Sequence, residues 1–149
     1  MFDLDDLYQE TILDHNRHPR NFGKLEGCDF SAEGRNPLCG DQLVIYVKVE
    51  DDVVEDIRFE GSGCAISKAS ASLMTESLKG KTRDEVADVF QRFRNLVMGV
   101  DVDTPSEELG KLVAFHGLSE FPVRVKCATL AWHTLQAALQ NESEPVTTE

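Results

Sequence analysis

The stretch GSGCAISKASASLMTESLKG, residues 61–80, marks the point where the chain changes character. Directly upstream of it, apolar and polar residues alternate, which is typical of strands with one buried face. Within it, the Ala- and Ser-rich run of residues 64–79 predicts a closely packed helix that ends at Gly80, and helical spacing continues downstream. Strands that come first and helices that follow favour an α+β domain.

Three strands are predicted ahead of this stretch. The first covers residues 28–33, where apolar and polar residues alternate, and the second is the β-branched run 42–49. The third covers residues 53–60. Together they predict a small antiparallel three-stranded sheet packed by helices. Cys28 falls on the apolar side of the first strand, so we expect a core thiol there and not a metal ligand.

Helices are predicted on both sides of the strands. One covers about residues 3–16, where apolar residues recur at helical spacing and Pro19 follows. Residues 82–85 and 104–107 both fit a capping box, and each box precedes an apolar stripe. The last helix is expected to begin near Pro122.

Composition limits the domain count and the partner classes. A chain of 149 residues with 41 % hydrophobic content suits one domain, expected over residues 1–140, with a flexible acidic tail over residues 141–149. The net charge of −12 disfavours nucleic acid as a partner. No apolar run approaches the ~20 residues that cross a membrane. The acidic first residues lack a signal-peptide pattern, so we expect a cytoplasmic protein with no membrane partner.

Three cysteines have local contexts that suit a metal site. Cys39 and Asp41 share the turn-like segment NPLCGD at residues 36–41, Cys64 lies where a strand gives way to a helix, and Cys127 lies near the start of the last helix. Three thiolates and one carboxylate form a complete tetrahedral set for zinc. Such soft ligands favour zinc or an iron–sulfur unit over calcium or magnesium. Because the spacings are long, three isolated and inert cysteines remain the alternative.

The four histidines are not expected to bind metal. His15 and His18 are three residues apart and could be ligands, but cations at the C-terminal end of the first helix are the better interpretation. His116 and His133 have no ligand-like neighbours in the sequence, so we expect them at helix ends or on the surface.

Three motifs resemble those of a known family. NPLCGD at residues 36–41, GSGCAIS at residues 61–67 and FPVRVKCA at residues 121–128 resemble, in this order, the IscU/NifU N-terminal family of iron–sulfur cluster assembly. The resemblance extends over about residues 2–140. It implies the α+β fold of that family. It also implies that one metal is bound by Cys39, Asp41, Cys64 and Cys127.

Two features differ from the scaffold branch of that family. Lys126 stands where the scaffold branch has a histidine, and residues 81–117 resemble an insertion that the branch lacks. Both features are similar to the SufU branch. That resemblance implies a zinc-dependent sulfurtransferase that takes persulfide sulfur from a SufS-like cysteine desulfurase and supplies downstream cluster-assembly proteins. A scaffold that assembles a [2Fe–2S] cluster is the alternative, and an inert structural zinc domain is a third hypothesis.

The sulfur-accepting thiol is predicted to be Cys39, because a loop rich in Pro and Gly can reach a partner's active site. Cys127 is the second candidate, since its helix limits its reach. Arg124 lies three residues before Cys127, on the same helical face. Arg124 therefore either contacts the desulfurase or supports a thiolate, and an ordinary surface arginine is the equally weighted alternative.

Overall fold

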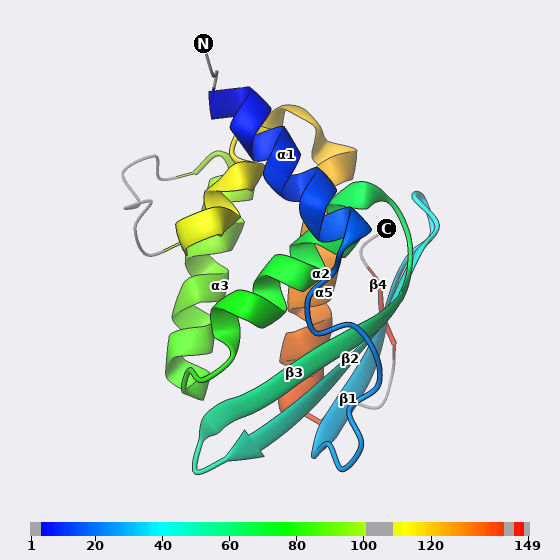
Figure 1. Ribbon diagram of the computed structural model, residues 1–149, viewed down its shortest axis with the longest axis vertical. Coiled ribbons are helices and arrows are strands. Elements are labelled where there is room, and N and C mark those ends of the chain that lie inside the picture. The colour runs from blue at the N-terminus through cyan, green and yellow to red at the C-terminus, as the bar shows by residue number, and fades with distance from the viewer. Residues whose placement is uncertain (1–3, 101–108, 142–144, 148–149) are drawn as a thin grey trace.

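The computed structural model of the chain describes residues 4–100, 109–141 and 145–147. Within these ranges, no helix has the length and hydropathy that crossing a bilayer requires. The capping box predicted at residues 104–107 lies outside the described residues. In chain order the elements are α1 (Leu4–Arg17), β1 (Phe30–Asn36), β2 (Asp41–Glu50), β3 (Val53–Ser62), α2 (Ala65–Leu78), α3 (Arg83–Met98), the 3₁₀ helices η1 (Gly110–Phe115) and η2 (Leu118–Glu120), α5 (Pro122–Leu139) and β4 (Val146–Thr147) (Figure 1).

The sheet has the strand order β3-β2-β1-β4. β1 pairs with β2 and β2 pairs with β3, both antiparallel, while β4 runs parallel to β1. The predicted α+β fold is therefore confirmed. The predicted number of three strands is wrong, because β4 is a fourth strand of the sheet. Val146 and Thr147 form that strand within the segment expected to be a flexible tail. A two-residue strand is too short to show an alternating pattern, so the sequence gives no sign of it.

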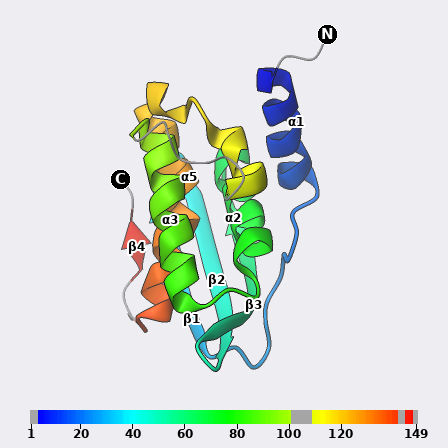
Figure 2. The same ribbon diagram turned by 90° about the vertical axis from the view of Figure 1, so that its left-hand side faces the viewer.

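The core lies between one face of the sheet and two helices. Leu43, Ile45 and Val47 of β2 alternate with more exposed residues and are fully buried, as the two-residue period of a strand requires. α2 and α5 contact each other and cover this face, while α1 packs on α2 and α3 packs beside α5 (Figure 2). Phe93 of α3 stacks on Trp132 of α5 with ring centroids 4.5 Å apart. This stacking anchors α3 to the core.

Capping chemistry starts α3 where the sequence predicts it. The Thr82 hydroxyl accepts a hydrogen bond from the Glu85 N–H at 3.2 Å, and the Glu85 carboxylate accepts one from the Thr82 N–H at 3.0 Å. This reciprocal pair is the predicted capping box, so that prediction is confirmed. Gly99, in the left-handed conformation with φ of 73°, ends the helix.

The prediction that Cys28 is a core thiol is wrong. β1 begins at Phe30, which pairs with Val47, so Cys28 precedes the strand. Its side chain is half-buried. The alternation of residues 28–33 suggested a strand two residues earlier than the pairing allows. Cys28 also lies at the opposite end of β1 from Asn36, which makes it a useful control for the other cysteines.

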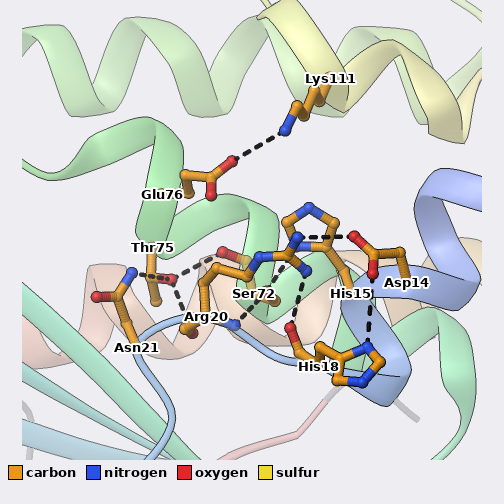
Figure 3. A network of polar contacts seen from close by, with 9 residues as sticks. All are labelled: Asp14, His15, His18, Arg20, Asn21, Ser72, Thr75, Glu76 and Lys111. Carbon is orange, nitrogen blue, oxygen red and sulfur yellow. Dashed lines mark hydrogen bonds and ion pairs between the residues drawn. The ribbon is translucent and has the colours of Figure 1, made fainter.

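His15 lies in the last turn of α1, as the sequence predicts, but it is a buried neutral ring and not the predicted cation. Only 1 % of its surface is exposed, and its Nδ1 lies 2.7 Å from Ser72 Oγ on α2 (Figure 3). The backbone N–H of Arg20 donates to the same Ser72 oxygen at 2.8 Å. His15 Nε2 has no partner among the described residues. Burial, reinforced by the nearby Arg20 guanidinium, lowers the pKa of His15, so the ring is neutral where α1 meets α2.

We expect His15 to make the protein less stable in mild acid. Its pKa is lower in the folded state than the ordinary histidine value of about 6.5, so below about pH 6.5 the unfolded chain binds a proton that the folded chain excludes. His15→Asn keeps a polar atom near Ser72 but does not titrate. Between about pH 7.5 and pH 5.5 the parent should lose more unfolding free energy than this variant, by at most about 1.4 kcal/mol per pH unit below 6.5.

Urea unfolding at a series of pH values measures this difference. His18→Asn, at an exposed histidine three residues further along, is the matched control and should follow the parent. Parallel pH profiles for the parent and His15→Asn would show that the buried ring is not linked to stability.

Candidate metal centre

Antiparallel pairing brings several chain reversals to one end of the sheet. Asn36 pairs with Asp41 across the turn that joins β1 to β2, and Cys39 lies within that turn. Gln42 pairs with Ser62, where β3 ends and the chain leads into α2. Cys39, Asp41 and Cys64 therefore lie at the same end of the sheet.

Three of the four predicted ligands form a compact group. One ligand atom each from Cys39, Asp41 and Cys127 lies within 4.8 Å of the other two, and the Cys39 and Cys127 sulfurs are 2.9 Å apart. Cys64 is not part of this mutually close set, but its sulfur lies 3.9 Å from Asp41 Oδ2. All four cysteines of the chain are free thiols. The structure thus brings the four predicted ligand residues together. Cys64 joins the group through its contact with Asp41.

The donor set fits a cation. Asp41 is only 2 % exposed, and no Lys, Arg or His among the described residues forms an ion pair with it. A buried carboxylate without a counter-ion is costly, because desolvation disfavours the charge. The neighbouring sulfur atoms are soft ligands, which zinc accepts and calcium or magnesium does not favour. A thiophilic divalent cation would therefore satisfy both the buried charge and the sulfur ligands.

Backbone hydrogen bonds position Asp41 and Cys64. Asp41 Oδ1 accepts from the Cys64 N–H at 2.8 Å, and the Cys64 sulfur caps α2 by accepting from the Ser67 N–H at 3.4 Å. Gly63 permits this close approach, because a Cβ at Gly63 would overlap Asp41 Oδ1 and lie 3.1 Å from the carboxyl carbon.

Cys127 has a different environment from Cys39. It is fully buried, and the Asn36 side-chain amide donates to its sulfur at 3.4 Å. Burial is the main cause that raises the pKa of Cys127, followed by the contact with Cys39 and the negative charges of Cys64 and Asp41. Cys127 is therefore a poor nucleophile unless a cation stabilises its thiolate. Cys39, in contrast, is half-buried on the turn.

Exposed side chains lie close in the sequence to the candidate ligands. Leu38, Phe121 and Val123 are large apolar residues that are 65 %, 59 % and 50 % exposed. Arg124 is also exposed, and its electrostatic interaction with Cys64 is the main cause that raises its pKa, with smaller contributions from Cys127 and Cys39. The guanidinium therefore lies within electrostatic range of these three sulfur atoms. These four residues, which we call the rim, form a surface with an apolar part and a cation.

Sequence reasoning missed Asn36. The sequence places it in a turn-like segment, yet it is fully buried with its amide on Cys127, and its Oδ1 has no hydrogen-bond partner in the described part of the chain. The only signal for this role was its position in the motif, directly before Pro37. Lys126, where the scaffold branch has histidine, lines a separate cavity with residues of α3 and α5.

The fold and the cysteine–aspartate centre define a class. Residues 7–128 match the NifU-like N terminal domain, so the chain belongs to this family. It is 42 % identical over 139 residues to the zinc-dependent sulfurtransferase SufU of Bacillus subtilis (strain 168), covering 93 % of each chain. It is also 37 % identical over 140 residues to the iron–sulfur cluster assembly scaffold protein IscU of Streptococcus pyogenes serotype M1, covering 94 % of this chain and 87 % of that one.

Solved structures agree with this membership. The crystal structure of FiSufU from Fervidobacterium islandicum AW-1, described as a scaffold protein for the SUF system, gives a TM-score of 0.83 at 35 % identity. The match covers 92 % of this chain and 99 % of that one. An N-terminal NifU-like protein from Brucella abortus, at 24 % identity and a TM-score of 0.81 over 93 % of this chain and 95 % of that one, supports the fold alone.

We expect Gly63→Ala to disturb the centre by displacing the Asp41 carboxylate. The added methyl group overlaps Asp41 Oδ1, so the Cys64 N–H loses its acceptor and the unfolding free energy falls by about 1–3 kcal/mol. Chemical denaturation of the purified protein measures the loss. Ser62→Ala, at the adjacent exposed position, is the control and should unfold like the parent. Equal stability of Gly63→Ala and the parent would mean that the carboxylate is not held as described.

Proposed function

We propose that this protein is a zinc-dependent sulfur acceptor that takes persulfide sulfur from a cysteine desulfurase and supplies it for iron–sulfur cluster assembly. The observation that carries the proposal is the group of Cys39, Asp41 and Cys127, with Cys64 in contact with Asp41. The name of the Bacillus subtilis relative supports the same activity. A reducing compartment such as the cytoplasm suits the free thiols.

We assign Cys39, Asp41, Cys64 and Cys127 as the zinc ligands. When bound, zinc stabilises the thiolate forms of its cysteine ligands at neutral pH. Two features of the chain itself would also stabilise negative charge on the cysteine ligands. Cys64 lies at the N-terminus of α2, where the helix dipole favours a negative charge, and the Arg124 cation lies in the field of the thiolates.

The chemistry is an exchange between two sulfur atoms. The Cys39 thiolate attacks the outer sulfur of the desulfurase persulfide, a new S–S bond forms on Cys39, and the S–S bond of the donor breaks. The donor cysteine leaves as a thiolate, so no external oxidant or reductant is required. Cys39 suits this role because it lies on a turn beside the exposed Leu38. Cys127, buried on α5 with a raised pKa, is the second candidate.

The rim is the surface that we assign to the desulfurase, a SufS-like enzyme. Leu38 is adjacent to Cys39 in sequence, and Phe121 and Val123 precede Cys127, so a partner bound to these side chains would cover the centre. Burying such apolar residues is the usual source of binding energy in an interface. Arg124 then contacts the partner or stabilises the thiolates during transfer.

A scaffold that assembles an iron–sulfur cluster is the second candidate function. The observation that favours it is the similarity to several proteins named as IscU scaffolds, among them that of Streptococcus pyogenes. Against it stands Lys126, at the position where histidine is expected in the scaffold branch. The metal content of the purified protein separates the two functions.

We expect about one zinc per chain and no iron–sulfur absorbance in protein purified in air, because the donor set is complete for a tetrahedral ion. Asp41→Asn keeps an oxygen that can accept from the Cys64 N–H but removes the charge, so it should weaken zinc binding by at least about tenfold. Elemental analysis and competition with a chelator measure both. Mostly iron, with cluster absorbance, would support the scaffold function, and unchanged retention in Asp41→Asn would exclude Asp41 as a ligand.

We expect Cys39→Ser to abolish the stimulation of a cysteine desulfurase, because the hydroxyl cannot accept the persulfide sulfur. Alanine production from cysteine, with and without this protein, measures the effect. Cys28→Ser is the matched control, since Cys28 lies at the other end of β1 and should leave stimulation intact. Stimulation by Cys39→Ser equal to that of the parent would rule out Cys39 as the acceptor and make Cys127 the next residue to test.

A further inference from the structure

The line of contact between α3 and α5 contains three cavities, of about 570, 210 and 190 Å³. Gln136 of α5 lines all three. Arg94 and His133 line the two larger cavities, and Phe90 lines the two smaller ones. Because neighbouring cavities share lining residues, they form a row along the two helices, which lie side by side in Figure 2. We call this the α3–α5 groove.

From this groove we propose a second binding site, for a small organic anion with an apolar body of about one ring. Its acid group would pair with Arg94, and its body would enter the 190 Å³ end of the groove. The proposal does not depend on the zinc-dependent function. None of the residues that line the groove is a proposed zinc ligand or part of the rim.

Charge supports an anionic ligand. Among the described residues that line the three cavities, the charged ones are Arg83, Arg94 and Lys126. None of these lining residues is an Asp or a Glu. Acidic residues outnumber basic ones by 27 to 15 in the whole chain, so an all-basic lining is opposite to the general surface. Arg83 is engaged by Asp52 and by the Leu139 carbonyl. Arg94 is exposed and forms no ion pair within the described part of the chain, so its guanidinium can pair with a carboxylate or phosphate.

Shape and polarity define the rest of the ligand. The 190 Å³ cavity is lined mainly by apolar side chains, among them Ala87, Phe90, Trp132 and Leu135. The Phe90 and Trp132 rings lie 5.8 Å apart and tilted by 32°, so they provide aromatic surface. A dry cavity of roughly 150 Å³ accommodates benzene, which sets the size of the body at about one ring. Beside it, His133 is half-buried and in edge contact with Phe90, with centroids 5.2 Å apart.

The groove is separate from the metal centre. Lys126, Thr129, His133 and Gln136 recur at intervals of three and four residues and therefore share one face of α5. Cys127 contacts Asn36 and Cys39, at the end of the sheet. A ligand in the groove would lie against a different side of the same helix, so the two sites can be tested independently.

The single tryptophan of the chain, Trp132, lines the apolar end and reports binding directly. We would titrate the full-length protein with benzoate and with benzamide, an uncharged molecule of the same size, and follow Trp132 fluorescence. Benzoate should saturate the signal and bind about tenfold more tightly than benzamide, because only benzoate pairs with Arg94. Equal affinities, or no response to benzoate, would overturn the proposal.

Three variants test the residues. Arg94→Gln should abolish the preference for benzoate, whereas Arg92→Gln, the same change on α3 outside the described lining, should keep it. Ala87→Phe should fill the apolar end and abolish binding of both molecules. Ala87 and Arg94 are exposed, so these changes should leave the thermal unfolding temperature near that of the parent. Unchanged benzoate affinity in Arg94→Gln would overturn the proposal. Binding of hexaglutamate without a response to benzoate would also overturn it, because the ligand would then be an acidic protein segment.

Discussion

The hydrogen bond from the Cys64 N–H to Asp41 Oδ1 is the contact on which the candidate metal centre depends. At 2.8 Å it joins the first residue of β2 to the residue that caps α2. It gives a buried carboxylate one fixed donor, while Oδ2 lies 3.9 Å from the Cys64 sulfur. This contact is possible because Gly63 has no side chain. One amide group thus sets both the start of a helix and the direction of a candidate ligand.

α5 connects the centre to the rest of the molecule. Its first turns place Cys127 beside the β1–β2 turn, and its middle carries Trp132 into the core against Phe93. A different side of the same helix lines the α3–α5 groove. Because the helix is held in the core by Trp132, the position of Cys127 is fixed by packing and not by local loop structure. Cys39, on a turn, is therefore the candidate ligand with greater freedom to move.

Much of the fold could be predicted, because alternating strands and capped helices leave local patterns. The capping box at Thr82 and Glu85 is one example. Features that depend on distant partners could not be predicted. β4 exists only by pairing with β1, His15 is buried only because Ser72 lies opposite it, and Asn36 contacts a sulfur 91 positions away. The four candidate metal ligands could be named because their motifs resemble those of a family; their spacings alone leave isolated cysteines as an alternative.

The distance along the chain between the ligands has a consequence for protein synthesis. Cys39 and Cys127 are 88 positions apart, yet their sulfurs are in contact. A ribosome releases the chain from its N-terminus, so Cys39 and Cys64 emerge well before Cys127 is made. Until α5 has been released and packed on the sheet, the nascent chain lacks one of the four proposed ligands. Under that proposal the early thiols have to stay reduced during translation, and the metal site is completed only in one of the last steps of folding.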